Sequence, residues 1–208
     1  MNGPVRGAVV LVHGLYLRGP AMWPLARRLR RAGFVCEILD HGSVGTEPAR
    51  TLGRLAARAG RLARHGPVHL LGHSLGGLLA LALAQREGGW GEGRILCLGA
   101  PIQGSAAAAA LVRRGLGAVL GRAAPLLSAG VEPVAGAQVG MIAGTRALGL
   151  GHWLARLPVP HDGTVAVAET QHPLLAMHRC MPVSHTGLLL HAAVAAVACD
   201  FLAGAGQA

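Results

Sequence analysis

A serine flanked by glycines follows an apolar run, and it is the strongest candidate nucleophile in the sequence. The apolar residues 68–71 lead into Gly72-His73-Ser74-Leu75-Gly76, and a stretch rich in leucine and alanine continues to residue 86. A serine hydroxyl attacks a carbonyl when its oxygen stands clear of the backbone and a base can reach it. A sharp turn from a strand into a helix meets the first condition, and glycines allow the close backbone approach that the turn requires. We therefore predict that Ser74 lies on a strained turn of this kind.

The positions of the aspartates and histidines after Ser74 indicate the acid and the base. Asp162 lies in a turn after the fifth expected strand, whereas Asp200 lies near the end of the last expected helix. His185 stands between the last strand and the closing helix, at the strand's carboxyl end, where catalytic groups of open parallel sheets gather. The remaining histidines after Asp162 are expected in a loop, a strand and a helix, in the order His172, His178 and His191. These positions favour Ser74, Asp162 and His185 as a triad. The alternatives are an aspartate that only shapes its own turn and a histidine that caps a helix or fills the core.

Two backbone amides are candidates for stabilising an oxyanion. Leu75 follows the nucleophile at the expected helix start, where amides point toward developing negative charge. Leu15 is the second candidate donor, because the sequence His13-Gly14 ends the first expected strand in a loop that can turn back on the site. His13 is expected to brace this loop, and His73 to turn its side chain away from the reacting atoms.

Strand-like and helical segments alternate along the chain. The expected strands are residues 8–12, 33–39, 68–71, 94–98, 139–143 and 177–183. The expected helices are residues 24–32, 48–64, 75–86, a stretch within 106–127, and 186–202. This alternation predicts an α/β fold, a doubly wound and mainly parallel sheet of about six strands with helices on both faces. Residues 1–208 are expected to form a single domain, without a linker or an internal repeat.

The segment 105–134 departs from this alternation of strands and helices, with a run of alanines followed by three glycines and a proline. It is too apolar for a fully exposed helix. Two arrangements are compatible with the pattern: an ordinary crossover packed on the sheet, or a mobile cap that overhangs the site.

Composition limits the classes of function. Hydrophobic residues make up 52% of the chain and charged residues 13%, which excludes disorder. The net charge of +10 would give a weak attraction to anionic membrane surfaces. A stripe of arginines in the second expected helix is interpreted as a solvated face: Arg50, Arg54, Arg58, Arg61 and Arg64. Three tryptophans, two phenylalanines and one tyrosine, with no reader motif, argue against nucleic-acid binding.

Cysteine and histidine spacing gives no sign of a metal site. The four cysteines are far apart in the sequence and are expected to be buried, reduced thiols: Cys36, Cys97, Cys180 and Cys199. The eleven histidines include no pair with zinc-binding spacing around an acid. The apolar residues 187–197 are too few to span a membrane, and residues 1–7 leave no room for a signal peptide before the first strand. A cytoplasmic protein is expected.

Together, these motifs resemble those of the compact bacterial lipase and esterase branch of the α/β-hydrolases. The oxyanion loop corresponds to His13-Gly14, the nucleophile elbow to residues 72–77, and a glycine-proline-glycine-serine segment to residues 99–105. The family's acid turn is similar to residues 162–165, and its histidine loop to residues 185–189. The order serine, aspartate, histidine agrees with this superfamily. The resemblance implies hydrolysis of a small-molecule or lipid carboxylic ester through an acyl-serine intermediate, with no metal or organic cofactor.

Other activities fit the same residues. The triad could transfer the acyl group to an alcohol or thiol, or it could act on a thioester, amide or lactone. In a different class, the fold could be a binding module that retains the pocket without catalysis. No motif specifies the head group, the acyl chain length or the oligomeric state.

Overall fold

A computed structural model describes residues 6–148 and 157–204 of the chain. The expectation about a signal peptide depended on residues 1–7, and residues 1–5 lie outside the described ranges.

Six parallel strands form one sheet in the order β2-β1-β3-β4-β5-β6, which confirms the predicted fold class. The strands are β1 (Ala8–Val12), β2 (Val35–Leu39), β3 (Val68–His73), β4 (Arg94–Leu98), β5 (Gln138–Gly144) and β6 (Met177–Met181). Strand order reverses next to β1 and β3, because β2 lies on one side of β1 and the later strands lie on the other. This reversal is where open α/β sheets place their sites, at the carboxyl ends of the strands.

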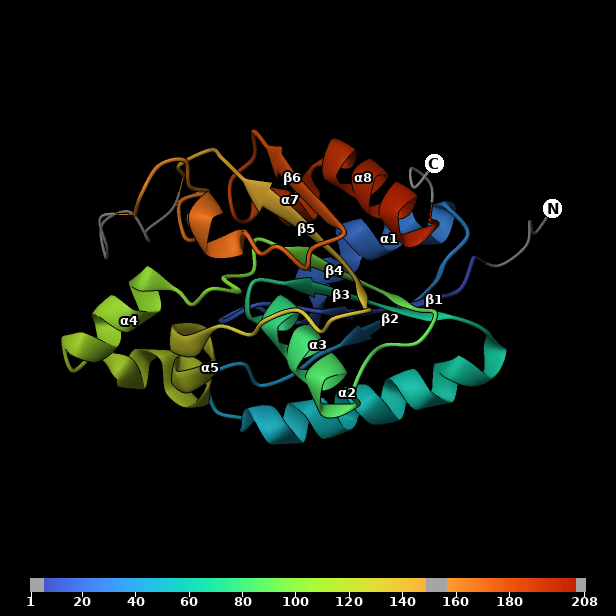
Figure 1. Ribbon diagram of the computed structural model, residues 1–208, viewed down its shortest axis with the longest axis horizontal. Helices are drawn as coiled ribbons and strands as arrows, with labels where there is room; N and C mark the ends of the chain where they lie inside the picture. The colour runs from blue at the N-terminus through green and yellow to red at the C-terminus, as the bar shows by residue number, and fades with distance from the viewer. Residues whose placement is uncertain (1–5, 149–156, 205–208) are drawn as a thin grey trace.

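Helices cover both faces of the sheet (Figure 1). The α-helices are α1 (Trp23–Arg31), α2 (Pro48–Leu62), α3 (Leu75–Arg86), α4 (Ala106–Arg113), α5 (Ala124–Ala129), α7 (Gly187–Leu190) and α8 (Ala192–Leu202). Short 3-10 helices are η1 (Gly19–Met22), η2 (Ala63–His65), η3 (Gly117–Ala123) and η4 (Val167–Thr170). Helices α2 and α3 pack on one face, and α1, α7 and α8 on the other.

The central strand β1 shows why its sequence is apolar throughout. Val10 and Val12 face the core layer under α2 and α3, whereas Val9 and Leu11 face the layer under α1 and α8. All four side chains are fully buried. A strand with helices on both sides has no polar face, so a continuous apolar run results in place of an alternating one.

The closing segment forms two helices where one was predicted. His191 takes an extended conformation, with φ −74° and ψ 133°, between α7 and α8. Its Nδ1 accepts a hydrogen bond of 3.3 Å from the amide of Ala193, so the ring caps α8. The placement of His191 inside a helix is therefore wrong, because a side chain that binds a nearby amide competes with the helical backbone pattern.

The cysteines differ in burial more than was predicted. Cys36 and Cys97 are buried, and loss of solvation raises the pKa of each thiol to about 12. Cys199 is half-buried, and Cys180 is exposed because β6 pairs only with β5 and forms an edge of the sheet. The expectation of burial was therefore wrong for Cys180.

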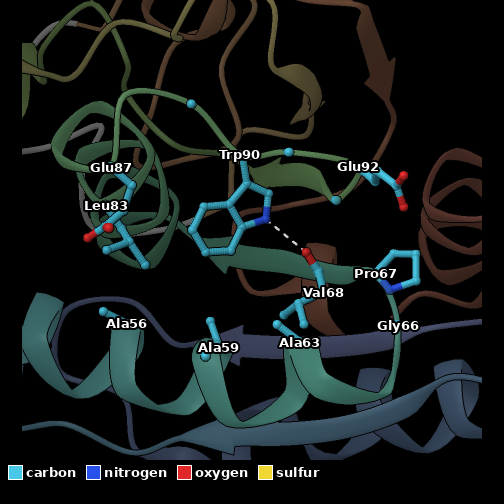
Figure 2. Close-up of a pocket in the computed structure, with 14 residues that line it drawn as sticks. Ala56, Ala59, Ala63, Gly66, Pro67, Val68, Leu83, Glu87, Trp90 and Glu92 are labelled. Carbon is cyan, nitrogen blue, oxygen red and sulfur yellow. Dashed lines mark hydrogen bonds between the residues drawn. The ribbon is translucent and has the colours of Figure 1, made fainter.

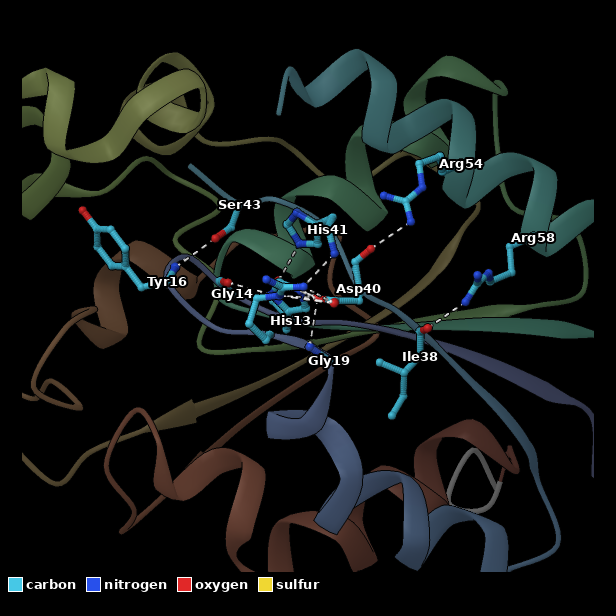
Figure 3. A network of polar contacts seen from close by, with 11 residues as sticks. His13, Gly14, Tyr16, Gly19, Ile38, Asp40, His41, Ser43, Arg54 and Arg58 are labelled. Atoms are coloured by element: carbon cyan, nitrogen blue, oxygen red, sulfur yellow. Dashed lines mark hydrogen bonds and ion pairs between the residues drawn. The ribbon is translucent and has the colours of Figure 1, made fainter. Parts of the chain in front are cut away.

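The arginine stripe of α2 is not wholly solvated. Arg58 donates a hydrogen bond of 2.7 Å to the carbonyl of Ile38, and Arg54 one of 2.9 Å to the carbonyl of Asp40 (Figure 3). These carbonyls lie at the carboxyl end of the edge strand β2, which has no neighbour on its outer side. The two guanidinium groups thus tie α2 to the sheet edge.

The segment 105–134 packs partly on the core and partly beyond the end of the sheet. It connects β4 to β5, and its apolar side chains Leu111, Leu120 and Leu127 join the core layer of α3. Helices α4 and α5 nevertheless lie beyond the end of the sheet, on the left of Figure 1. Among the described residues, no helix is both long and apolar enough to cross a membrane.

Two glycine substitutions should have opposite effects on stability. A β-carbon on Gly76 would overlap the carbonyl of Val12, so Gly76→Ala should lower the free energy of unfolding by about 3 kcal/mol or more. Gly53 lies within α2 with open space around it, so Gly53→Ala should raise stability by up to about 1 kcal/mol. Urea denaturation measures both. Equal effects of the two variants would contradict the close approach at Gly76.

Candidate functional site

Ser74 occupies the turn between β3 and α3 with a strained backbone. Its φ of 53° and ψ of −120° are rare for a residue with a side chain. The amide of Ser74 donates a hydrogen bond of 2.8 Å to the carbonyl of Leu98 on the neighbouring strand. A β-carbon on Gly72 would overlap the backbone of Gly76. The glycines thus allow strand and helix to approach closely enough for the turn to form.

Asp162 and His185 form a short side-chain pair. Their Oδ2 and Nδ1 atoms lie 2.6 Å apart, and the amide of His185 donates a further hydrogen bond of 3.0 Å to the Asp162 carbonyl. Asp162 is 1% exposed. Its Oδ1 accepts hydrogen bonds from the amides of Thr164 and Val165, at 2.9 and 2.8 Å. The carboxylate therefore holds the imidazole by Nδ1, which leaves Nε2 free for another partner.

The charge state of Asp162 follows from these contacts. Burial acts most strongly and would raise its pKa, but the hydrogen bonds and charge of His185 and the two backbone amides together outweigh it. The pKa of Asp162 is therefore lowered, and the group is a carboxylate at neutral pH.

Two glycines at the carboxyl ends of buried strands make room for this pair: Gly99 follows β4, and Gly144 is the last residue of β5. Gly99 has φ 56°, and a β-carbon there would approach both Asp162 Oδ2 and His185 Nδ1 to 3.1 Å. A β-carbon on Gly144 would lie 2.7 Å from Cβ of Asp162. The sequence analysis assigned neither residue this function, and the signal available to it was a glycine at the end of an apolar run.

His73 does not turn away from the site as expected. Its ring lies against that of His185, with centroids 4.5 Å apart, and its Nε2 donates a hydrogen bond of 3.0 Å to the His185 carbonyl. Burial lowers the pKa of His73 to about 3, so the ring is neutral. The expectation failed because the residue before the nucleophile ends a central strand, where its side chain meets the loop that carries His185.

The oxyanion candidates both belong to segments next to Ser74. Leu75 is the first residue of α3, so its amide has no acceptor within the helix. A β-carbon on Gly14 would lie 3.1 Å from Cβ of Ser74 and 3.0 Å from Nδ1 of His73, so the loop of Leu15 packs directly against the turn. Leu15 itself lines the same cavity as Ser74.

A second aspartate–histidine pair supports the loop after β1 (Figure 3). His13 Nε2 lies 3.0 Å from Asp40 Oδ1, and its ring stacks on His41 with centroids 4.1 Å apart. The Arg18 guanidinium beside Asp40 holds the pKa of that carboxyl well below its usual range. Burial lowers the pKa of His41 to about 4, and its Nε2 donates to the His13 carbonyl at 3.1 Å. His13 thus braces the loop, with partners the sequence analysis missed because they precede the nucleophile.

Glu169 is another buried carboxylate that the sequence analysis missed. Its two oxygens accept hydrogen bonds from the amides of Ala106, at 2.6 Å, and Ala166, at 2.9 Å. Burial raises the pKa of this carboxyl. Glu169 joins the segment after Asp162 to the start of α4.

The remaining candidates lie apart from Ser74. His172 accepts a hydrogen bond from the amide of Leu174, His178 contacts the hydroxyl of Thr170, and Asp200 is exposed. Within residues 6–148 and 157–204, no group of three histidine, cysteine, aspartate or glutamate side chains is arranged to hold a metal ion.

A cavity of about 420 Å³ contains both Ser74 and His185. Its walls come from the loop after β1, from the residues next to Asp162, and from the segment that includes α4, η3 and α5. Most of the remaining lining is apolar: Leu15, Leu17, Pro101, Ala107, Ala108, Leu111, Val119, Leu120, Leu127, Leu148 and Val165. A reacting group bound here would be surrounded by hydrocarbon next to a serine and an imidazole.

A larger and more open cavity of about 560 Å³ lies at the opposite ends of the strands (Figure 2). It lies between α2 and the loop after α3, where the indole of Trp90 donates a hydrogen bond of 2.8 Å to the carbonyl of Val68. Alanine and glycine form much of its wall, and none of Ser74, Asp162 or His185 reaches it. The smaller cavity is therefore the candidate site.

Comparison with known proteins identifies the family of this chain. The model of the alpha/beta hydrolase family matches residues 9–205. The chain belongs to the alpha/beta hydrolase family. No curated protein matches the sequence of this alpha/beta hydrolase.

Several solved structures share the fold. The mature lipase BlEst2 of Bacillus licheniformis has a TM-score of 0.74 and 17% identity, over 97% of this chain and 94% of that chain. A monoacylglycerol lipase of Paleococcus ferrophilus has a TM-score of 0.64 and 17% identity, over 97% and 95%. The RedJ thioesterase of Streptomyces coelicolor has a TM-score of 0.60 and 14% identity, over 96% and 85%. At these identities the likeness shows the fold alone.

Stability of this alpha/beta hydrolase should fall as the pH drops from about 6.5 to about 4. In this range an unfolded histidine gains a proton, but His41 and His73 stay neutral in the folded state, so acid favours unfolding. The stabilisation is complete above the ordinary histidine pKa of about 6.5. His73→Gln, which can still donate to the His185 carbonyl, should reduce the pH slope by up to about 1.4 kcal/mol per pH unit. Urea denaturation at several pH values measures this, and an unchanged slope would show that His73 is not a neutral buried ring.

Proposed function

We propose that this alpha/beta hydrolase is a serine carboxylic ester hydrolase of the esterase or lipase type. One observation carries the proposal: a buried Asp162 holds His185 by Nδ1, and His185 lines the same apolar cavity as a serine on a strained turn. A base, its orienting acid and a nucleophile are the groups that acyl transfer through serine requires.

The proposed reaction begins with proton transfer. His185 Nε2 takes the hydroxyl proton of Ser74 while Oγ forms a bond to the ester carbonyl carbon. Asp162 stabilises the imidazolium by the 2.6 Å contact with Nδ1. The imidazolium then gives the proton to the departing alcohol as the ester bond breaks. In the second half, water loses a proton to His185 and attacks the carbonyl carbon of the acyl-serine. The imidazolium then returns the proton to Oγ of Ser74 as the acyl–serine bond breaks and the carboxylic acid leaves.

The oxyanion of the tetrahedral intermediate needs hydrogen-bond donors that are already in place. The amides of Leu15 and Leu75 are proposed for this function, the first from a loop packed against Ser74 and the second from the free end of α3. Neither contribution depends on a leucine side chain.

The surroundings of Ser74 support an apolar acyl group as the substrate portion bound there. Leucine, alanine and valine side chains of the segment with α4, η3 and α5 enclose the cavity next to the nucleophile. A net charge of +10 adds a weak attraction to anionic surfaces, where lipid esters are presented.

Ser74→Ala should reduce hydrolysis of p-nitrophenyl esters by on the order of 10³-fold or more. It should also abolish labelling by a fluorophosphonate probe, because both require the Oγ nucleophile. The matched control is Ser128→Ala, which removes a buried hydroxyl from α5 outside the cavity and should leave activity and labelling unchanged. Hydrolysis that survives in Ser74→Ala would refute the assignment.

The same assay, run with other substrates, shows which type of acyl bond the protein cleaves. Thioester, amide and lactone analogues are compared with the ester, and an added alcohol or thiol tests for acyl transfer. We expect the ester to be preferred and the acid to remain the main product. A protein that neither hydrolyses any of them nor reacts with the probe would be a binding module.

Two substitutions in α4 test whether the apolar wall of the cavity binds the acyl group. Ala108 lines the cavity, so Ala108→Leu should raise KM for octanoyl esters several-fold while acetyl esters are affected little. Ala106, on the same helix, has an exposed side chain and does not line the cavity, so Ala106→Leu is the control. Steady-state kinetics across acyl chain lengths measure the change. If both variants behave alike, the acyl group lies elsewhere.

A further inference from the structure

Tyr16 is held in a strained conformation next to the proposed oxyanion donor Leu15. Its φ of 60° lies in the left-handed region, which a residue with a side chain seldom occupies. The only other non-glycine residue with positive φ among the described residues is Ser74. Such strain persists where surrounding contacts impose it.

Two contacts hold Tyr16 in place. Its amide donates a hydrogen bond of 3.0 Å to Oγ of Ser43, in the loop between β2 and α2 (Figure 3). Its phenol donates a hydrogen bond to the carbonyl of Val119 in η3, although the tyrosine is 60% exposed. An exposed aromatic ring is thus directed at a backbone acceptor in the segment that covers the cavity.

The segment around η3, here called the cap (residues 106–129), is also attached to the loop that carries Ser43. The amide of Arg122 donates a hydrogen bond of 2.8 Å to the carbonyl of Val44. Gly121 has φ 58°, and a β-carbon there would overlap the same carbonyl. An exposed ion pair of 3.1 Å joins Arg122 to Glu47. The cap, the Ser43 loop and the loop of Leu15 therefore meet at Tyr16.

The position of Leu15 depends on its two neighbours in the chain. On one side, Gly14 packs against Ser74 and His73. On the other side, Tyr16 is fixed by the two contacts described above. The direction of a backbone amide is set by the torsions around it, so the direction of the Leu15 amide is fixed only while both neighbours stay in place.

We infer that Tyr16 is a positioning residue, which links the placement of the cap to the direction of the Leu15 amide through its bond to Val119. With the cap in place, the tyrosine holds the strained loop and the donor faces the reacting carbonyl. If the cap moves away, the loop loses this restraint and transition-state stabilisation weakens. This inference rests on the proposed ester hydrolase function.

Tyr16→Phe removes the phenol oxygen alone and keeps the ring. We expect kcat for p-nitrophenyl acetate to fall roughly 5- to 50-fold, a part of the 10²- to 10³-fold loss when an oxyanion donor is removed. KM should change less than about twofold, because the bound ester is held equally well. Ser43→Ala, which removes the acceptor of the Tyr16 amide, should lower kcat in the same direction.

Two further measurements separate positioning from a general loss of structure. The melting temperature of Tyr16→Phe should stay within about 2 °C of the unmodified protein. Affinity for a trifluoromethyl ketone, whose hemiketal oxyanion occupies the same hole, should weaken by the same factor as kcat/KM. The control is Glu47→Gln, which removes the other side-chain link between the cap and the Ser43 loop and should leave kcat within about twofold.

The outcomes are distinct. If Tyr16→Phe keeps full kcat while the unmodified protein shows turnover that requires Ser74, the positioning function is wrong and the ester hydrolase proposal stands. A rise in KM alone in Tyr16→Phe would make the tyrosine a substrate contact. A fall in kcat of Glu47→Gln equal to that of Tyr16→Phe would make the effect one of cap stability. Either result overturns the inference. If the unmodified protein has no turnover that requires Ser74, both proposals fail together.

Discussion

The backbone contact between the end of β3 and the start of α3 is the constraint on which the proposed site depends. A β-carbon on Gly72 would overlap the backbone of Gly76, one on Gly76 would overlap the carbonyl of Val12, and Ser74 between them takes a φ of 53°. This geometry is maintained by the burial of the strand and of most of the helix on both sides of the turn. The cost of the strained residue is small compared with the hydrophobic free energy of these elements. The candidate nucleophile is therefore held in an unfavourable conformation at the end of a fully buried strand.

Charge is organised around this turn in a chain that carries few acids. Each of two aspartates holds a histidine by a ring nitrogen: Asp162 holds His185, and Asp40 holds His13. They differ in surroundings, because Asp162 is buried under backbone amides whereas Asp40 shares its carboxylate with the exposed Arg18. The ring beside His185 is His73, which burial keeps neutral. A second positive charge next to His185 would oppose formation of an imidazolium there, and the neutral neighbour avoids it.

The cap connects parts of the molecule that the sheet alone would leave independent. Its first residue, Ala106, is bound by Glu169 from the segment after Asp162, and Arg122 is bound by the loop after β2. Apolar side chains between these points enclose the cavity and continue into the core layer of α3. The segment after Asp162, the loop after β2 and the loop of Leu15 are therefore all hydrogen-bonded to one covering segment. The proposed site and the apolar wall of its cavity are linked for this reason.

Local sequence patterns were enough to predict the fold class and most element positions, because periodicity and turn residues act over a few residues at a time. The ends of the six predicted strands agree with those of β1 to β6 to within two residues. The break at His191 and the exposure of Cys180 were missed, since one depends on a side-chain cap and the other on which strand lies at the edge.

For the site, the sequence by itself determined which residue types stand at the carboxyl ends of strands, and hence Ser74, Asp162 and His185 as candidates. Only the tertiary structure decided that Asp162 and His185 lie 2.6 Å apart, that His73 supports the histidine loop, and that Tyr16 meets the cap. These contacts join residues separated by 23 to 112 positions in the chain. No local pattern encodes such pairs, because they arise where the packing of the sheet and its helices brings separate loops together.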